Sequence, residues 1–265
     1  MKLYLAGGAS RPFVFEEYMK VYLAGEGCYV KDKGTWETYP KSDLLVLESF
    51  FYATDWHEQF IPTFKSFLLD SGAFTFMQNT KVKLDWDEYT ERYANFINKN
   101  KIELFFELDI DSIVGIKEVE RLRDKLEALT NRKCIPVWHK SRGKEYWINL
   151  CKTYDYIAIG GIVGGEIKKD EYRFFPTLLN IAQEHNTKVH GLGFTNLKGL
   201  ERYKFYSVDS TAWIYGNRSG FVQWFDGKTL QKVKAKPGQK MKSRETAIHN
   251  FNEWVKFQKY AEVNL

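Results

Sequence analysis

The sequence predicts an α/β protein: a (β/α)8 barrel of the TIM type, followed by a C-terminal β-hairpin and helix. Short apolar runs rich in β-branched and aromatic residues recur along the chain, and stretches with helical periodicity separate most of them. Eight such repeats fit into about 215 residues, which suits a compact barrel better than an open doubly wound sheet. The 265 residues are enough to bury a substantial core.

The eight expected strands share a short apolar stretch that ends in a small, polar or acidic residue. They are Lys2–Ala6, Leu44–Ser49, Ser66–Asp70, Glu103–Asp109, Cys134–His139, Tyr156–Gly160, Lys188–Gly193 and Phe205–Asp209. Apolar residues at helical spacing predict helices over Asp85–Asn98, Ile116–Leu129 and Phe175–His185.

The end of the chain has a different sequence pattern from the eight repeats. Apolar segments at Phe221–Phe225 and Thr229–Val233 flank Asp226-Gly227, a pair that suits a tight hairpin turn. The stretch Arg244–Tyr260 reads as a closing helix. Because no low-complexity linker interrupts the chain, we expect one domain over residues 1–265, with 218–265 as a hairpin and basic helical extension.

Charge permits a polyanionic partner without requiring one. The net charge is +5, from 39 basic and 34 acidic residues. The late excess is a candidate phosphate-contacting surface, although a solvated lysine-rich face is equally compatible with it. It consists of Lys228, Lys232, Lys234, Lys236, Lys240, Lys242 and Arg244. As nucleic-acid contacts we single out Arg142, Arg218, Lys234 and Lys236.

The three cysteines, Cys28, Cys134 and Cys151, lie far apart and form no CxxC pair. A disulfide framework or a structural zinc site is therefore not expected, and a reducing compartment fits best. The N-terminus lacks a secretory signal, and no apolar run reaches the roughly 18 residues of a membrane span. We expect a cytoplasmic protein with no metal, no cofactor and no membrane partner.

Three aspartates, Asp70, Asp109 and Asp209, each close an apolar run. A carboxylate at the end of a buried strand is unfavourable unless it is paired or takes part in chemistry. In a barrel these strand ends gather at one face, where catalytic groups lie. A carboxylate beside a sugar C1′ can displace a base and form a covalent ester, and a second one can move the proton.

Each acid also has a structural alternative. Asp209 could cap a following helix through Ser210 and Thr211, and Asp70 could likewise be a helix cap. Asp109 and Asp111 alternate on the expected strand, so only one of them should face the pocket. That pair could hold a divalent metal, but without a nearby His or Asp partner the signature is weak.

The segment Gly160–Gly165 is glycine-rich directly after a strand but lacks the spacing of a P-loop or a dinucleotide fingerprint. Close backbone contact with a flat ligand is the better interpretation. His139 could bond a base or a phosphate, although a structural histidine is the more common case. We assign no catalytic role to His190.

Taken in order, six segments resemble the tRNA-guanine transglycosylase superfamily over roughly residues 66 to 218. They are Asp70–Phe74 (DSGAF), Leu108–Ile110 (LDI), Pro136–His139 (PVWH), Ile159–Ile162 (IGGI), His190–Gly193 (HGLG) and Val208–Trp213 (VDSTAW). Each segment alone is weak, and six in order on successive strands are fairly specific.

The resemblance implies that Asp209 is the nucleophile, Asp70 the general acid and base, and Asp109 the residue that reads the guanine edge. It implies base contacts from Ser71, Gly72, His139, Gly160, Gly161, Ile162 and Gly191. The zinc-binding cluster and the RNA-binding accessory domain of the tRNA enzymes have no counterpart here, and His139 stands where the family has a glutamine. The chain is therefore most similar to the compact zinc-free DpdA-type DNA-guanine transglycosylases of phages and bacteria.

The expected function is exchange of guanine in DNA for a 7-deazaguanine base, such as 7-cyano-7-deazaguanine, in a bacterium or a phage-infected host. The target nucleotide must then be unstacked to expose C1′. The alternatives are base exchange in tRNA, a non-catalytic nucleic-acid-binding subunit, and an unrelated barrel glycosidase acting on nucleosides. Self-association into a homo-oligomer is left open.

Overall fold

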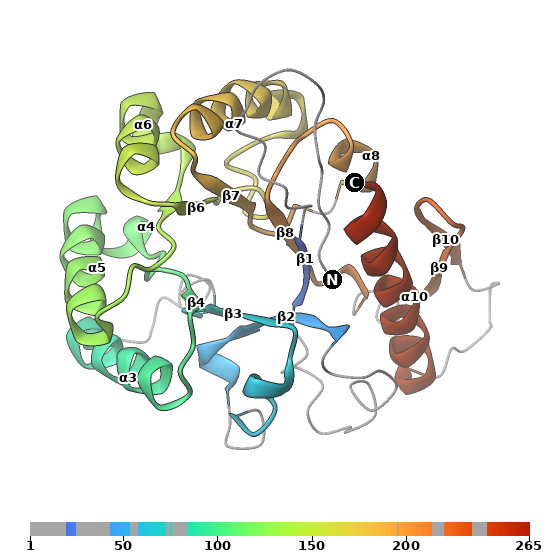
Figure 1. Cartoon of the computed structure of the whole chain (residues 1–265), viewed down its shortest axis with the longest axis horizontal. Helices are drawn as coiled ribbons and strands as arrows, with labels where there is room; N and C mark the ends of the chain where they lie inside the picture. Colours follow the sequence, from blue (N-terminus) through green and yellow to red (C-terminus); the bar gives the residue numbers. More distant parts are fainter. Residues whose placement is uncertain are drawn as a thin grey trace.

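The protein is an α/β structure in which parallel strands run through the middle and helices lie outside them (Figure 1). This computed structural model describes residues 20–24, 43–53, 58–72, 75, 84–194, 196–213, 220–234 and 243–265. The main sheet has eight strands in the order β4-β3-β2-β1-β8-β7-β6-β5. Its pairings are all parallel, so the carboxyl ends of its strands lie at one edge.

The strands of the main sheet are β1 (Lys20–Ala24), β2 (Leu45–Ser49), β3 (Ser66–Asp70), β4 (Leu104–Phe105), β5 (Val137–Trp138), β6 (Tyr156–Ile159), β7 (Lys188–Gly191) and β8 (Ser207–Ser210). The α-helices are α3 (Trp86–Lys99), α4 (Asp111–Val114), α5 (Ile116–Thr130), α6 (Gly143–Thr153), α7 (Phe175–Glu184), α8 (Leu197–Leu200) and α10 (Ser243–Asn264). Short 3-10 turns are η4 (Phe50–Tyr52), η5 (Ile61–Thr63), η6 (Lys140–Arg142) and η7 (Lys169–Phe174).

Seven of the eight expected strands are confirmed, although β4 and β5 are shorter than expected, at two residues each. The predicted strand Lys2–Ala6 lies outside the described residues. We expected no strand or helix over Lys20–Ala24, yet this segment is β1 and pairs with both β2 and β8.

The predicted helices α3, α5 and α7 are confirmed within two residues of their expected ends. Asp85 caps α3, because its Oδ1 accepts from the backbone N–H groups of Asp87 and Glu88 at 3.0 and 3.1 Å. Helix α6 was not predicted. It buries Trp147, whose indole N–H donates to the carbonyl of Leu178 on α7 at 3.0 Å.

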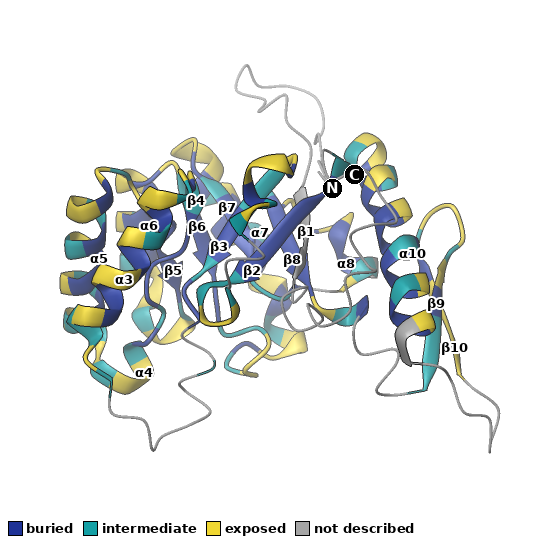
Figure 2. Ribbon diagram, turned by 90° about the horizontal axis from the view of Figure 1, so that it is seen from below, coloured by how far each residue is buried: buried dark blue, intermediate teal, exposed yellow. Residues whose placement is uncertain are grey.

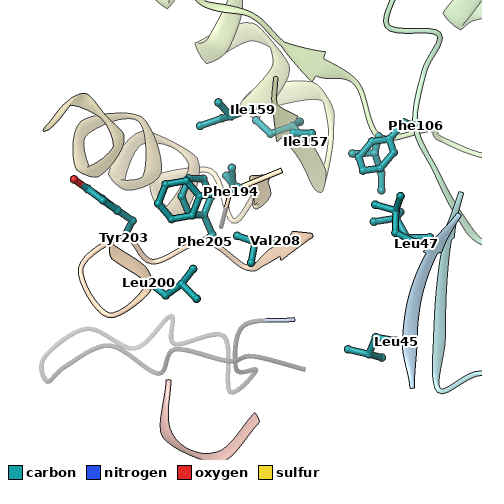
Figure 3. Packing of buried hydrophobic residues seen from close by; sticks show 14 of the residues in the cluster. Leu45, Leu47, Phe106, Ile157, Ile159, Phe194, Leu200, Tyr203, Phe205 and Val208 are labelled. Atoms are coloured by element: carbon teal, nitrogen blue, oxygen red, sulfur yellow. The ribbon is translucent and has the colours of Figure 1, made fainter. Parts of the chain in front are cut away.

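In the main sheet, the strand residues whose burial is described are largely buried, and the outward faces of the surrounding helices are exposed (Figure 2). A smaller apolar cluster joins α3 and α5 to β3 and β4. The larger one fills the rest of the molecule. In Figure 3, Phe194, Tyr203 and Phe205 pack together, with Phe194 and Phe205 ring centroids 5.1 Å apart. Such aromatic pairs account for part of the high aromatic content.

The C-terminal hairpin is confirmed as β9 (Phe221–Phe225) and β10 (Leu230–Lys234), paired antiparallel. It is attached to α10 by side-chain contacts with the β9 backbone. Asn250 Oδ1 accepts from Gln223 N–H and Glu253 Oε2 accepts from Phe225 N–H, both at 2.7 Å. Trp254 Nε1 donates to Gln223 Oε1 at 2.9 Å. Helix and hairpin therefore pack as one unit beside the sheet (Figure 1).

Strands β4 and β5 stand at the two ends of the sheet order, and an isolated parallel bridge between Phe106 and Ile135 lies between them. Glu107 reinforces this junction with its side chain. Its Oε1 accepts the N–H of Val137 on β5 at 2.8 Å, and its Oε2 accepts from Arg123 on α5 at 3.0 Å. The Glu107 side chain is fully buried. Burial raises its pKa, against the opposing effect of Arg142 and Arg123.

Among the helices that the structure describes, none combines the length and the apolar composition needed to cross a lipid bilayer.

Replacing Glu107 with Ala should lower the free energy of unfolding by about 3–5 kcal/mol, because two buried guanidinium groups lose a shared carboxylate. Urea denaturation of the purified protein measures this. The matched control is Glu118→Ala, which removes an exposed carboxylate that pairs with Arg121 and should leave the unfolding midpoint nearly unchanged. Equal midpoints for the wild type and Glu107→Ala would contradict the role of this side chain.

Candidate active site

The acids singled out in the sequence lie at the carboxyl edge of the sheet. Asp70 is the last residue of β3, Asp209 lies inside β8, and Asp109 follows β4 by four residues. The Asp109 and Asp209 charges are near enough to raise the pKa of Asp70. The structure thus brings together three carboxyl groups that are far apart in the sequence.

Asp70 has an unusual protonation equilibrium for an aspartate. Burial, together with the charges of Asp109 and Asp209, raises its pKa to about 6, against a hydrogen bond that lowers it. That bond runs from the Gly72 N–H to Asp70 Oδ2 at 3.0 Å. A carboxyl group with this pKa can both release and accept a proton close to neutral pH.

Asp209 is 7% exposed, and its contacts converge on one oxygen. Oδ1 accepts the backbone N–H of Gly193 at 2.5 Å and lies 3.2 Å from His190 Nε2. Within the described part of the chain, neither of these contacts caps a helix. The described contacts of Asp209 therefore do not support the alternative in which it is a helix cap. Ser210 is the residue whose side chain accepts from Ala212 N–H at 3.0 Å.

His139, directly after β5, lies between two carboxylates. Its Nε2 is 2.7 Å from Asp109 Oδ1, and its Nδ1 is 2.7 Å from Glu166 Oε2. Burial lowers the pKa of His139, but the bonds to Asp109 and Glu166 outweigh it and raise the value to about 9. The ring is therefore an imidazolium at neutral pH and donates on both sides.

Asp111 does not alternate with Asp109 on a strand, because β4 ends at Phe105 and Asp111 begins α4. The expectation that the two side chains point to opposite faces is wrong. Arg142 approaches both: its Nε donates to Asp111 Oδ2 at 2.9 Å, and its Nη2 lies 3.9 Å from Asp109 Oδ1.

Arg142 is also not a surface residue. Its side chain is 3% exposed and donates to Glu107 Oε1 at 3.1 Å and to the carbonyl of Val137 at 2.5 Å. The expectation that Arg142 contacts a nucleic-acid phosphate does not fit this placement. Of the other three candidate phosphate contacts, Lys234 is exposed on β10, and Arg218 and Lys236 lie outside the described residues.

The weak metal signature of the sequence is stronger in space. Asp109, Asp111 and His139 each offer a ligand atom, and these atoms lie within 4.8 Å of one another. Two cations of the protein already satisfy the two carboxylates, namely the His139 imidazolium and the Arg142 guanidinium. As folded, this donor set fits a paired charge cluster better than a metal cage.

The glycine-rich loop packs against the side chains of this cluster. A Cβ on Gly160 would lie 2.8 Å from His139 Nε2, and one on Gly161 would lie 2.5 Å from Glu166 Oε2. Gly161 also has a φ of +74°. Both glycines therefore leave room for the protein's own His139 and Glu166, and Ile162 packs against the larger apolar cluster.

The remaining predicted base contacts are Ser71 and Gly72, which directly follow Asp70, and Gly191, the last residue of β7. The Ser71 hydroxyl is buried and has no hydrogen-bond partner among the described residues. Gly72, with a φ of +81°, would place a Cβ 2.7 Å from that of Phe51. A Cβ on Gly191 would approach Phe194 and Phe205, so the absence of a side chain there serves aromatic packing.

Glu166 and Gly193 were not among the predicted site residues, and His190 was considered but given no catalytic role. Glu166 directly follows the glycine-rich loop, and its one signal in the sequence is that it is a single acid at the end of that loop. His190 and Gly193 belong to the HGLG segment, which we used only for its resemblance. Their contacts with Asp209 depend on β7 and β8 being neighbours, which the segment itself does not encode.

No protein-family model matches this chain, and a search of curated proteins finds no match to it either.

The His139 imidazolium predicts a pH-dependent contribution to stability. Because its folded pKa of about 9 exceeds the unfolded value of 6.5, the contribution is complete below pH 6.5 and is lost as pH rises toward 9. At most it amounts to about 3 kcal/mol. Urea unfolding at pH 6 and pH 9 should show this loss in the wild type and not in His139→Gln. The same pH dependence in both proteins would rule the imidazolium out.

Proposed function

We propose that the protein is a base-exchanging glycosyltransferase that replaces guanine in DNA with a 7-deazaguanine derivative. The observation that carries the proposal is the pairing of two unlike carboxyl groups. Asp70 titrates near neutral pH, whereas Asp209 is anchored through Oδ1 by two nitrogen atoms. Acid–base work and nucleophilic attack require this division of roles.

The first half-reaction removes the old base. Asp209 Oδ2 attacks C1′ of the unstacked nucleotide, the bond from C1′ to the base nitrogen breaks, and the electron pair goes to the base. Protonated Asp70 gives that base its proton. A new base then loses a proton to Asp70 and attacks C1′, which breaks the ester and releases Asp209 as a carboxylate.

Base recognition falls to Asp109 in this proposal. His139 occupies its Oδ1, so Oδ2 is the oxygen that remains for the N–H edge of a guanine-like ring. The buried Ser71 hydroxyl, which has no partner among the described residues, supports a ligand contact beside Asp70. His139 itself has both ring nitrogens engaged, so we give it the role of holding Asp109 rather than reading the base.

The proposal includes a closed (β/α)8 barrel. The bridge between Phe106 and Ile135 and the Glu107 contact with Val137 support closure, because they join the two ends of the strand order. A closed barrel would direct the strand ends carrying Asp70, Asp109 and Asp209 into one mouth.

Asp209→Asn should abolish a denaturant-stable adduct between the protein and a guanine-containing DNA oligonucleotide, because the amide cannot form the ester. The wild type is mixed with oligonucleotide and 7-cyano-7-deazaguanine and examined on a denaturing gel. Asp124→Asn, an exposed acid of α5, is the matched control and should form the adduct normally. Base exchange by Asp209→Asn at the wild-type rate would contradict the assignment of Asp209 as the nucleophile.

The choice of polynucleotide is tested by measuring the incorporation of labelled base into DNA and into tRNA in parallel. A preference for tRNA would favour the alternative, base exchange in tRNA.

Asp70 should control the pH dependence of base departure. Only its protonated form can protonate the leaving base, so the rate of adduct formation in a single turnover should fall as pH rises above about 6. Asp70→Asn should slow this step by about 10²- to 10⁴-fold. Asp87→Asn, which removes an acid of α3 whose side chain is 46% exposed, should retain the wild-type pH profile. A wild-type rate that is flat between pH 5 and 8 would contradict this role.

A further inference from the structure

A chain of polar side chains leads to Asp209 from Tyr156, a partly buried residue at the amino end of β6. Tyr156 Oη lies 2.5 Å from Ser207 Oγ, and Ser207 Oγ also bonds His190 Nδ1. The other ring nitrogen, Nε2, faces Asp209 Oδ1 at 3.2 Å. His190 and Ser207 are both fully buried, so these contacts are shielded from water.

The direction of the hydrogen bonds follows from the last contact. A carboxylate oxygen only accepts, so His190 Nε2 must carry the hydrogen. In a neutral ring, Nδ1 is then the acceptor and Ser207 donates to it. Ser207 has one hydroxyl hydrogen, so Tyr156 must donate to Ser207. With a neutral ring, this single arrangement satisfies all three contacts.

We infer that His190 is a positioning residue for Asp209, locked by Ser207 and Tyr156 in the tautomer that carries its hydrogen on Nε2. The inference rests on the proposed function for its catalytic meaning. His190 and the Gly193 N–H both donate to Oδ1, so rotation of the carboxylate is restrained and Oδ2 is the oxygen directed at C1′. Among the described residues, none donates a hydrogen bond to Oδ2.

The same two donors act in both half-reactions. When the C1′–Oδ2 bond forms, Oδ1 becomes the carbonyl oxygen of the ester and still accepts both N–H groups. When the incoming base attacks C1′, the C1′–Oδ2 bond breaks and its electron pair returns to the carboxylate. Negative charge then spreads onto Oδ1, where the two donors stabilise it.

The tautomer is tested on the resting protein, without any substrate. In protein labelled with ¹⁵N-histidine, the His190 signals are assigned by their loss in His190→Gln. We expect Nε2 protonated and Nδ1 unprotonated, and in Ser207→Ala we expect this preference to weaken. A hydrogen on Nδ1 in the wild type, in a neutral or a doubly protonated ring, would overturn the inference whether or not the protein exchanges bases.

The catalytic role is tested by kinetics with the guanine oligonucleotide and 7-cyano-7-deazaguanine. His190→Leu should lower kcat by about 10²-fold or more with little change in KM for the oligonucleotide. His190→Gln, which retains an N–H donor, should recover part of that loss, and Ser207→Ala should lower kcat while leaving the ring in place. His185→Gln, an exposed histidine at the end of α7, is the control.

The outcomes separate the two proposals. Wild-type kcat in both folded His190→Leu and Ser207→Ala, with folding checked by circular dichroism, would overturn the positioning role and leave the proposed function standing. A wild type that forms no adduct and exchanges no base would defeat the proposed function. The nitrogen spectra would then still decide whether His190 donates to Asp209.

Discussion

The arrangement of the site depends on the buried carboxylate of Glu107. It joins the β5 backbone to Arg123 on α5 and to Arg142, at a junction where the sheet itself supplies an isolated bridge. Arg142 in turn holds Asp111, and His139 follows directly on β5. Removing one partner of such a buried network leaves charges uncompensated, which is strongly destabilising. The positions of Asp111 and His139 therefore depend on a buried ion network around Glu107.

Much of the sheet was predictable because a buried strand needs a local apolar run, and such runs are visible in the sequence. Strand β1 was missed because Lys20–Ala24 (KVYLA) has nearly the same pattern as Lys2–Ala6 (KLYLA), which we chose as the first strand, and such a short segment does not show that it pairs with β2 and β8. The acids Asp70, Asp109 and Asp209 were found because a charge that ends an apolar run needs an explanation. Their partners were not, because contacts such as that of His139 with Glu166 depend on strand order and loop path.

The carboxyl groups of the site are stabilised in different ways. His139 and Arg142 offset Asp109 and Asp111, the His190 ring and the Gly193 N–H hold Asp209, and burial raises the pKa of Asp70 to about 6. Burial, aided by the charges of Asp109 and Asp209, thus raises the pKa of Asp70 toward neutrality without a dedicated histidine. In the proposed reaction, this difference would separate the group that moves the proton from the groups that bind the base.

Gly193 contacts both Asp209 and the loop that leads to Glu166, the partner of His139. Its N–H holds Asp209, and a Cβ built on it would lie 2.2 Å from Val163 Cγ2, on the loop that continues to Glu166. Its φ of +66° already disfavours any other residue. A single methyl group at position 193 would disturb the N–H that binds Asp209, the proposed nucleophile. Through the loop, it would also disturb the contact between Glu166 and His139. Position 193 should therefore tolerate substitution poorly, because the missing Cβ is what leaves room for Val163.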